Sequence, residues 1–257
     1  MPMLKTADAE IYYEEHGAGF PLLIFAPGGL RSELAFWHSS PSSPGAAPPW
    51  MNPMADLAGK FRVVAMDQRN AGKSTGTVAA THGWDTYARD QLALMDHLGI
   101  ERAHVMGGCI GASFCLKLCE MAPQRIAAAV LQNPIGHDNN RAVFANLVKT
   151  WADGLKAKGR PLDESVVASF GRNMFAGDFV FSVSRDFVRG CAIPMLLMPG
   201  DDAPHPAAVA AEIGRLAPNL ETMQAWKGPE HLKAAIARVR DFLERHTPAP
   251  RTRSSAA

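Results

Sequence analysis

The sequence is poor in two features that would point to particular classes of protein. Cysteine is scarce: four in 257 residues are too few for a disulfide scaffold, so we expect reduced thiols. An excess of charge of one sign is also absent, because 26 basic and 25 acidic residues give a formal net charge of only +1. Without a basic stripe, neither nucleic acid nor a membrane is expected as the main partner. A small-molecule substrate is the expected partner, and a homodimer is compatible with this composition.

Long apolar runs are absent as well. No segment approaches the roughly 18 uninterrupted apolar residues of a membrane span, and no apolar region follows Lys5 as it would in a secretion signal. We therefore expect a cytoplasmic protein. What the chain does contain is 47% hydrophobic residues, which is enough to bury a large core in one α/β domain with an insertion.

Apolar runs alternate with helical patterns along the chain. The runs that predict strands lie over 10–16, 21–26, 61–66, 103–106, 126–131, 195–198 and 221–226, and the helical patterns lie over 84–98, 112–121 and 229–245. This alternation predicts an α/β fold with a mostly parallel sheet and helices on both faces. Residues 30–54 show little periodicity and predict a long loop, while 247–257 are too polar and proline-rich to fold and predict a disordered tail.

The segment Gly107-Gly108-Cys109-Ile110-Gly111 joins a predicted strand to a predicted helix. A sharp turn of this kind forces its middle residue into a strained backbone conformation and tolerates only small residues two positions to either side. The N-terminus of the following helix favours a thiolate over a thiol. The pattern therefore predicts that Cys109 is a nucleophile, although a buried structural cysteine would also fit such a turn.

Four segments in register together resemble the α/β-hydrolase-fold family. The first is the strand-to-helix turn around Cys109, called the nucleophile elbow in that family. The others are Phe25-Ala26-Pro27-Gly28-Gly29, Asp67-Gln68-Arg69-Asn70-Ala71-Gly72-Lys73-Ser74, and Asp96-His97-Leu98-Gly99-Ile100. Asn70 stands where the family has a glycine, and asparagine is the residue that best accepts a left-handed backbone after glycine. The resemblance implies an α/β-hydrolase core over 1–133 and 190–246, with a small helical cap insertion over 134–189.

The same resemblance implies a triad in the order nucleophile, acid, histidine. Asp202 matches the position of the family's acid, with Asp201 as the alternate; both could instead cap a following helix. His231 is the expected base, because it is the only histidine between the acid loop and the body of the last helix, but a surface position would explain it equally well. His38 is the reserve base or a substrate contact.

Backbone N–H groups of Gly29 and Ile110 are the implied oxyanion donors, with Leu30 as the alternative to Gly29 if the register slips by one. Trp37, His38 and Trp50 in the long loop, together with Trp151 in the cap, are the expected substrate contacts. No metal and no cofactor are expected.

These expectations combine into a cofactor-independent hydrolase that cleaves an ester, lactone or thioester of a small apolar substrate through an acyl-enzyme on Cys109. An acyltransferase or a C–C bond hydrolase with the same site is the first alternative, because a thioester also transfers its acyl group to acceptors other than water. A non-catalytic binding protein on this scaffold is the second.

Overall fold

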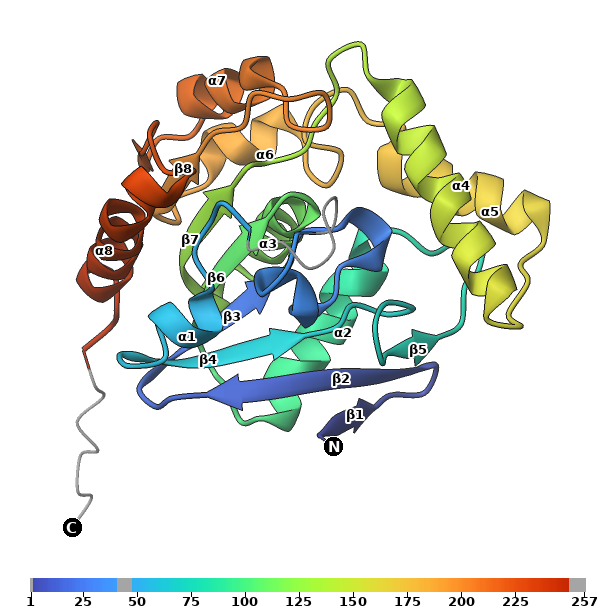
Figure 1. Ribbon diagram of the computed structural model, residues 1–257, viewed down its shortest axis with the longest axis horizontal. Helices are drawn as coiled ribbons and strands as arrows, with labels where there is room; N and C mark the ends of the chain where they lie inside the picture. The colour runs from blue at the N-terminus through green and yellow to red at the C-terminus, as the bar shows by residue number, and fades with distance from the viewer. Residues whose placement is uncertain (1, 41–47, 250–257) are drawn as a thin grey trace.

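The computed structural model of the protein describes residues 2–40 and 48–249, and a central sheet runs through it (Figure 1). Its strand order is β1-β2-β4-β3-β6-β7-β8-β9, with β5 paired to β2. From β4 to β9 neighbouring strands are parallel, whereas β2 pairs antiparallel with β1, β4 and β5. The strands are β1 (Met3–Lys5), β2 (Ala9–His16), β3 (Phe20–Phe25), β4 (Phe61–Met66), β5 (Thr75–Gly76), β6 (Ala103–Gly108), β7 (Ile126–Gln132), β8 (Met195–Met198) and β9 (Leu220–Thr222).

Helices cover both faces of this sheet, which confirms the predicted fold class. Helices α1 and α8 lie on one face and α2 and α3 on the other, while α4 and α5 pack on each other beyond the sheet (Figure 1). The helices are α1 (Pro53–Asp56), α2 (Trp84–His97), α3 (Ile110–Met121), α4 (Arg141–Ala157), α5 (Glu164–Phe175), α6 (Arg185–Gly190), α7 (Ala207–Leu216) and α8 (Pro229–Arg245), with short 3-10 turns η1 (Gly29–Arg31), η2 (Leu34–Trp37) and η3 (Pro123–Arg125).

The continuous apolar runs of the central strands have a simple physical basis. In β3, Leu23 and Phe25 belong to the hydrophobic cluster under α2 and α3, whereas Leu22 and Ile24 belong to the cluster under α1 and α8. Successive side chains of a strand point to opposite faces, so a sheet covered on both faces needs apolar residues at every position. Apolar runs therefore predict the central strands well, while the short edge strands β1 and β5 had no such signal.

Two predicted segments differ from the structure in extent. The loop over 30–54 contains η2, most of η1 and the first two residues of α1, and its residues 41–47 lie outside the described residues. The last strand ends at Thr222 instead of continuing to Trp226. Of the tail over 247–257, only residues up to 249 are described, and there Thr247 donates its hydroxyl to the Leu243 carbonyl at 2.9 Å.

The segment 134–189 forms α4, α5 and α6, and its division from the core as a cap stays a prediction. One link between this segment and the rest of the chain is polar: the Arg160 guanidinium donates to Asn70 Oδ1 and to the Gly76 carbonyl, both at 2.7 Å. Asn70 has φ 63°, the left-handed conformation expected for the residue that replaces a glycine. No helix within 2–40 and 48–249 is both long and apolar enough to cross a bilayer.

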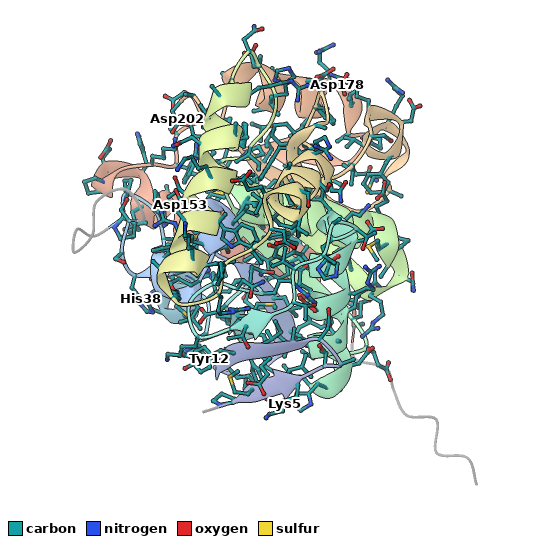
Figure 2. All side chains as sticks on the ribbon, turned by 90° about the vertical axis from the view of Figure 1, so that its right-hand side faces the viewer. Lys5, Tyr12, His38, Asp153, Asp178 and Asp202 are labelled. Atoms are coloured by element: carbon teal, nitrogen blue, oxygen red, sulfur yellow. The ribbon has the colours of Figure 1, made fainter. Side chains whose placement is uncertain are left out.

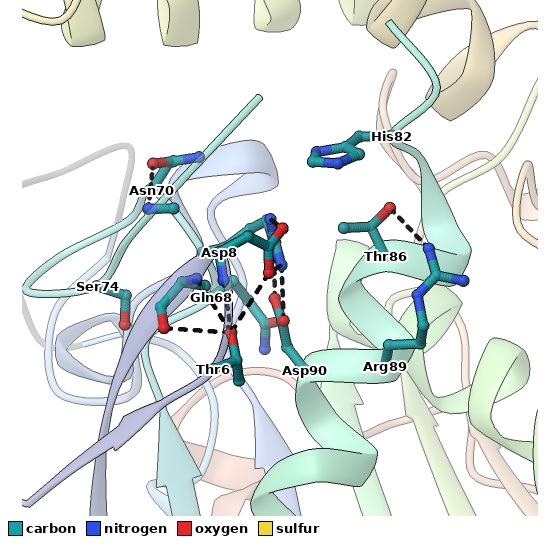
Figure 3. Close-up of polar contacts among 12 residues, drawn as sticks. Thr6, Asp8, Gln68, Asn70, Ser74, His82, Thr86, Arg89 and Asp90 are labelled. Carbon is teal, nitrogen blue, oxygen red and sulfur yellow. Dashed lines mark hydrogen bonds and ion pairs between the residues drawn. The ribbon is translucent and has the colours of Figure 1, made fainter. Parts of the chain in front are cut away.

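A buried ion cluster fixes the turn that follows β4 (Figure 3). Arg69 donates to both carboxylate oxygens of Asp90 at 2.7 Å and to Asp8 at 3.1 Å, and the side chains of Arg69 and Asp90 are each only 4% exposed. A bidentate pair of this kind is specific in geometry as well as charge. It holds the turn from Asp67 onward against the start of the chain and against α2.

Candidate active site

Cys109 occupies the turn between β6 and α3, with φ 58° and ψ −120°. This positive φ is unfavourable for a residue with a side chain and costs of order 1–3 kcal/mol. Both predicted glycine requirements are visible: a Cβ on Gly107 would lie 2.1 Å from the Gly111 carbonyl, and one on Gly111 would lie 2.2 Å from the Phe25 carbonyl oxygen. The Cys109 N–H donates to the Gln132 carbonyl at 2.9 Å, which ties the turn to the neighbouring strand.

The loop after β8 places a carboxylate and an imidazole together. Asp202 Oδ1 lies 2.5 Å from His205 Nδ1, and the His205 backbone N–H donates to Asp202 at its carbonyl (3.0 Å) and at Oδ1 (3.1 Å). The ring is therefore held by the same turn that supplies its carboxylate partner. Gly200 makes room for it, because a Cβ there would lie 2.5 Å from the Cβ of His205. The Asp202 side chain is 52% exposed, whereas that of His205 is only 11% exposed.

The other side of the His205 ring interacts with the Cys109 thiol. Burial opposes ionisation of this thiol, but the charge of His205 and a hydrogen bond with it outweigh that effect and lower the pKa of Cys109. Burial also opposes the charge on His205, and the combined action of Cys109 and Asp202 reverses this and raises the pKa of His205 to about 9. The buried Nε2 of this ring has no hydrogen-bond partner of ordinary geometry among residues 2–40 and 48–249. The thiol and the imidazole thus shift each other's pKa in the direction that favours a thiolate and an imidazolium.

The Asp202 carboxylate is ionised in this arrangement. Burial raises the pKa of Asp202, yet its hydrogen bond to His205 and the charges of His205 and Lys227 lower it overall. The alternate acid, Asp201, points elsewhere: its side chain is 84% exposed and lies 3.3 Å from Lys227 Nζ. The structure thus brings Asp202, and not Asp201, to the imidazole.

His231 does not reach Cys109. It lies in the first turn of α8, its Nε2 is 3.7 Å from Glu230 Oε1, and it lines a different hollow, together with Asp201. The physical reason is the short connection from β9: α8 begins directly after Gly228, so no loop carries this imidazole over the sheet edge. The imidazole that the structure places beside Cys109 is thus that of His205, three residues after Asp202, and not that of the expected His231.

His38 also lies away from the thiol. Its side chain is exposed, and Nδ1 is 3.0 Å from Asn52 Nδ2. Figure 2 shows Asp202 and His38 at separate places on the surface. His38 is not among the described residues that line the cavity around Cys109. The structure therefore does not place it where a reserve base or a substrate contact would lie.

Two backbone amides point at the sulfur. Those of Gly28 and Ile110 hydrogen-bond to the Cys109 thiol and help to lower its pKa. Ile110 was expected from its place directly after the nucleophile. The second amide belongs to Gly28, one residue before the expected Gly29, whereas the alternative, Leu30, lies one residue after Gly29. Gly28 has φ 114°, a left-handed conformation suited to glycine, while Gly29 lines the same cavity and its amide stays a predicted donor.

The sulfur opens into a cavity of about 710 Å³, a volume typical of small-molecule sites. Trp37, Trp50 and Trp151 line it, as expected for substrate contacts. A fourth tryptophan, Trp226, was missed because it was assigned to the last strand. Its indole N–H donates to the Pro199 carbonyl at 2.9 Å, which fixes the ring beneath the loop that carries Asp202.

No cluster of three or more histidine, cysteine or carboxylate side chains within the described ranges is placed to hold a metal ion. The remaining cysteines lie apart from the cavity and are buried, and burial raises the pKa of each of them: Cys115, Cys119 and Cys191. Only Cys109 combines a lowered pKa with access to the cavity.

Comparison with known proteins supports the observed fold. Residues 21–175, more than half of the chain, match the family model of the alpha/beta hydrolase fold. The putative carbamate hydrolase RutD of Azorhizobium caulinodans is 32% identical over 133 residues, which cover 52% of this chain and 44% of that protein. The chain thus matches less than half the length of that relative. A non-heme haloperoxidase of Rhodococcus erythropolis is 26% identical over 240 residues, covering 79% and 82% of the two chains.

Among solved structures, the enol-lactonase of Burkholderia xenovorans superposes with a TM-score of 0.65 at 20% identity. The superposition covers 95% of this chain and 100% of that one. At this level of identity the likeness extends to the fold alone.

Proposed function

The chain belongs to the alpha/beta hydrolase fold family, and from that premise we propose that it is a cofactor-independent hydrolase with a Cys109–His205–Asp202 triad. The proposed substrates are esters, lactones or thioesters. The observation that carries the proposal is the setting of the Cys109 thiol: the residue is strained at a strand-to-helix turn, its pKa is lowered by His205, and two backbone amides point at its sulfur. Nucleophilic catalysis needs this combination of an activated group, a proton carrier and anion donors.

In the proposed first half-reaction, the thiolate attacks the carbonyl carbon and forms a C–S bond, while the carbonyl π electrons move to oxygen. The amides of Ile110 and of Gly28 or Gly29 stabilise the resulting oxyanion. As the intermediate collapses, the C–O bond to the leaving group breaks and the His205 imidazolium gives its proton to the departing oxygen. The products are a thioester on Cys109, a neutral imidazole and a free alcohol.

In the second half-reaction, neutral His205 takes a proton from water as that water attacks the thioester carbonyl. Collapse of this intermediate breaks the C–S bond, releases the acid and restores the thiolate–imidazolium pair. Asp202 keeps the ring in place and stabilises its positive charge in both steps, which is the role of the acid in triads of this type. Attack by an alcohol or amine instead of water would make the same site an acyltransferase.

Intact-mass spectrometry during reaction with p-nitrophenyl acetate tests the proposal. The expected result is a transient acetyl adduct on Cys109 that disappears as acetate is released, and no adduct in Cys109→Ala. A persistent adduct that is discharged only by an added alcohol or amine would indicate the acyltransferase. Release of nitrophenol without an adduct, or no release at all from intact protein, would contradict the proposed triad.

A further inference from the structure

Several polar atoms around the cavity are left without partners within residues 2–40 and 48–249. The indole nitrogens of Trp37, Trp50 and Trp151 are buried donors of this kind, in contrast to Trp226, and the oxygens Gln132 Oε1 and Asn133 Oδ1 are buried acceptors. Buried polar atoms are costly to leave unpaired, so the cavity favours a ligand that carries polar groups as well as an apolar body.

Cationic side chains line the same cavity. Arg31 lies in η1, three residues after the Gly28 amide that points at the sulfur, and Lys227 lies just before α8. Arg31 makes no ion pair with any described residue, while Lys227 lies 3.3 Å from Asp201. Among the described lining residues the single carboxylate is Asp202, which is already paired with His205. An anionic ligand in this cavity would therefore meet a guanidinium that forms no ion pair with a described carboxylate.

The walls of the cavity favour a flat ligand. Trp37, Trp50, Trp151 and Trp226 together are four of the five tryptophans in the chain, and the aliphatic side chains of Val143 and Leu147 from α4 complete the lining near them. Tryptophan rings offer broad apolar faces that stack best on other flat π systems.

We propose that the cavity selects acyl compounds whose body is a flat aromatic or conjugated unit carrying a carboxylate, with the carboxylate bound by Arg31. This inference rests on the proposed function, because it places the scissile carbonyl of the same molecule at Cys109. A guanidinium binds a carboxylate through two parallel hydrogen bonds, which fixes both the position and the orientation of the group. Arg31 is thereby the residue that sets specificity for charge, and the tryptophans set specificity for shape.

Calorimetric titration with two unreactive probes, 2-naphthoate and 2-naphthamide, tests this without requiring turnover. The two probes share size and flatness and differ in charge. The expected result is at least about tenfold tighter binding of 2-naphthoate, since hydrogen bonds between charged groups are stronger than those between neutral ones. Arg31→Met should remove most of that preference. The matched control is Arg240→Met, which removes an exposed arginine of α8 outside the cavity and should leave the preference intact.

Equal affinity for the two probes, or a preference that survives Arg31→Met, would overturn the proposal. If Arg31→Met does not fold, the salt dependence of the wild-type protein decides: added salt must weaken binding of 2-naphthoate and leave that of 2-naphthamide unchanged. The shape requirement is checked with benzoate and cyclohexanecarboxylate, of which benzoate should bind more tightly, and Trp151→Leu should reduce the difference.

Turnover separates this inference from the proposed function. The enzyme should cleave 4-acetoxybenzoate with a higher kcat/KM than methyl 4-acetoxybenzoate, and Arg31→Met should bring the two values together. If neither ester is cleaved while 2-naphthoate still binds in preference to 2-naphthamide, the proposed function fails and the charge selectivity of the cavity stands. If both esters are cleaved equally well, the charge selectivity fails and the hydrolase stands.

Discussion

Two clusters of charged side chains, one around Arg69 and one around Cys109, differ in whether a proton can move within them. Burial works against the Arg69 charge, but the hydrogen bonds and charges of Asp90 and Asp8 raise its pKa still further, so this guanidinium keeps its proton. In the second cluster the pKa of Cys109 is lowered and that of His205 is raised to about 9. The second cluster therefore places a proton donor next to a proton acceptor, which the first does not.

The difference separates a structural role from a chemical one. Arg69 connects the turn after β4 to the N-terminal segment and to α2, and it lies outside the cavity. Cys109 and His205 line the cavity. Removing the first cluster should therefore affect stability, and removing the second should affect reactivity.

Cys109→Ala is expected to produce the largest change. Without the thiol no acyl-enzyme forms, and kcat/KM for p-nitrophenyl acetate should fall by at least about 10⁴-fold, because triad nucleophiles account for effects of that size or larger. Thermal unfolding should change little, since alanine keeps the Cβ that causes the backbone strain at this position and the substitution removes only the sulfur. Substantial residual hydrolysis would show that another nucleophile, or directly activated water, carries the reaction.

Arg69→Met should mainly lower stability. It leaves the buried Asp90 carboxylate without its partner, and breaking a buried ion pair in this way costs about 3–5 kcal/mol. Urea denaturation of the variant measures this loss. The matched control is Arg62→Met, which breaks the more exposed pair with Glu15 and should cost at most about 1 kcal/mol. Similar losses in both variants would remove the distinction between a buried structural cluster and a surface pair.

Asp202→Asn should reduce kcat/KM by about 10²-fold. The amide still fills the space beside His205, but it no longer stabilises the imidazolium, and losses of this order are typical for general acid–base groups. Asp201→Asn is the control, because Asp201 contacts Lys227 and not the imidazole. If the two variants behave alike, Asp202 is not the orienting acid.

His231→Ala should have the smallest effect, with kcat/KM within about twofold of the wild-type value, whereas His205→Ala should lose about 10³-fold. The two variants are informative together because both histidines follow Asp202 in the sequence, but only His205 lies beside Cys109. A large loss in His231→Ala, together with hydrolysis that survives in His205→Ala, would show that the base is His231 in α8.

Most of the fold followed from the sequence because each central strand is a continuous apolar run and each turn is marked by glycine or proline. The turn around Cys109 was equally predictable, since backbone atoms lie too close to Gly107 and Gly111 for either residue to carry a Cβ. The short strands β1 and β5 carry too few residues for any periodicity to show.

The position of His205 beside Cys109 was not predictable in the same way. His205 stands three residues after Asp202, a spacing that also occurs where an aspartate simply caps a turn, so its sequence context did not single it out. What makes it functional is the direction of its ring, which depends on the bonds from Asp202 and on the close approach to Gly200. Trp226 escaped notice for a related reason, because the early end of β9 turns it toward the cavity.

The central claim is that His205 holds Cys109 as a thiolate, and the pH dependence of alkylation by iodoacetamide tests it most directly. In the wild-type protein, labelling of Cys109 should reach half its maximal rate below the ordinary thiol pKa of about 8.5. The other three thiols, with raised pKa values, serve as internal references. In His205→Ala the midpoint for Cys109 should move upward, because the favourable charge is lost while burial remains. An unchanged midpoint in that variant would contradict the account.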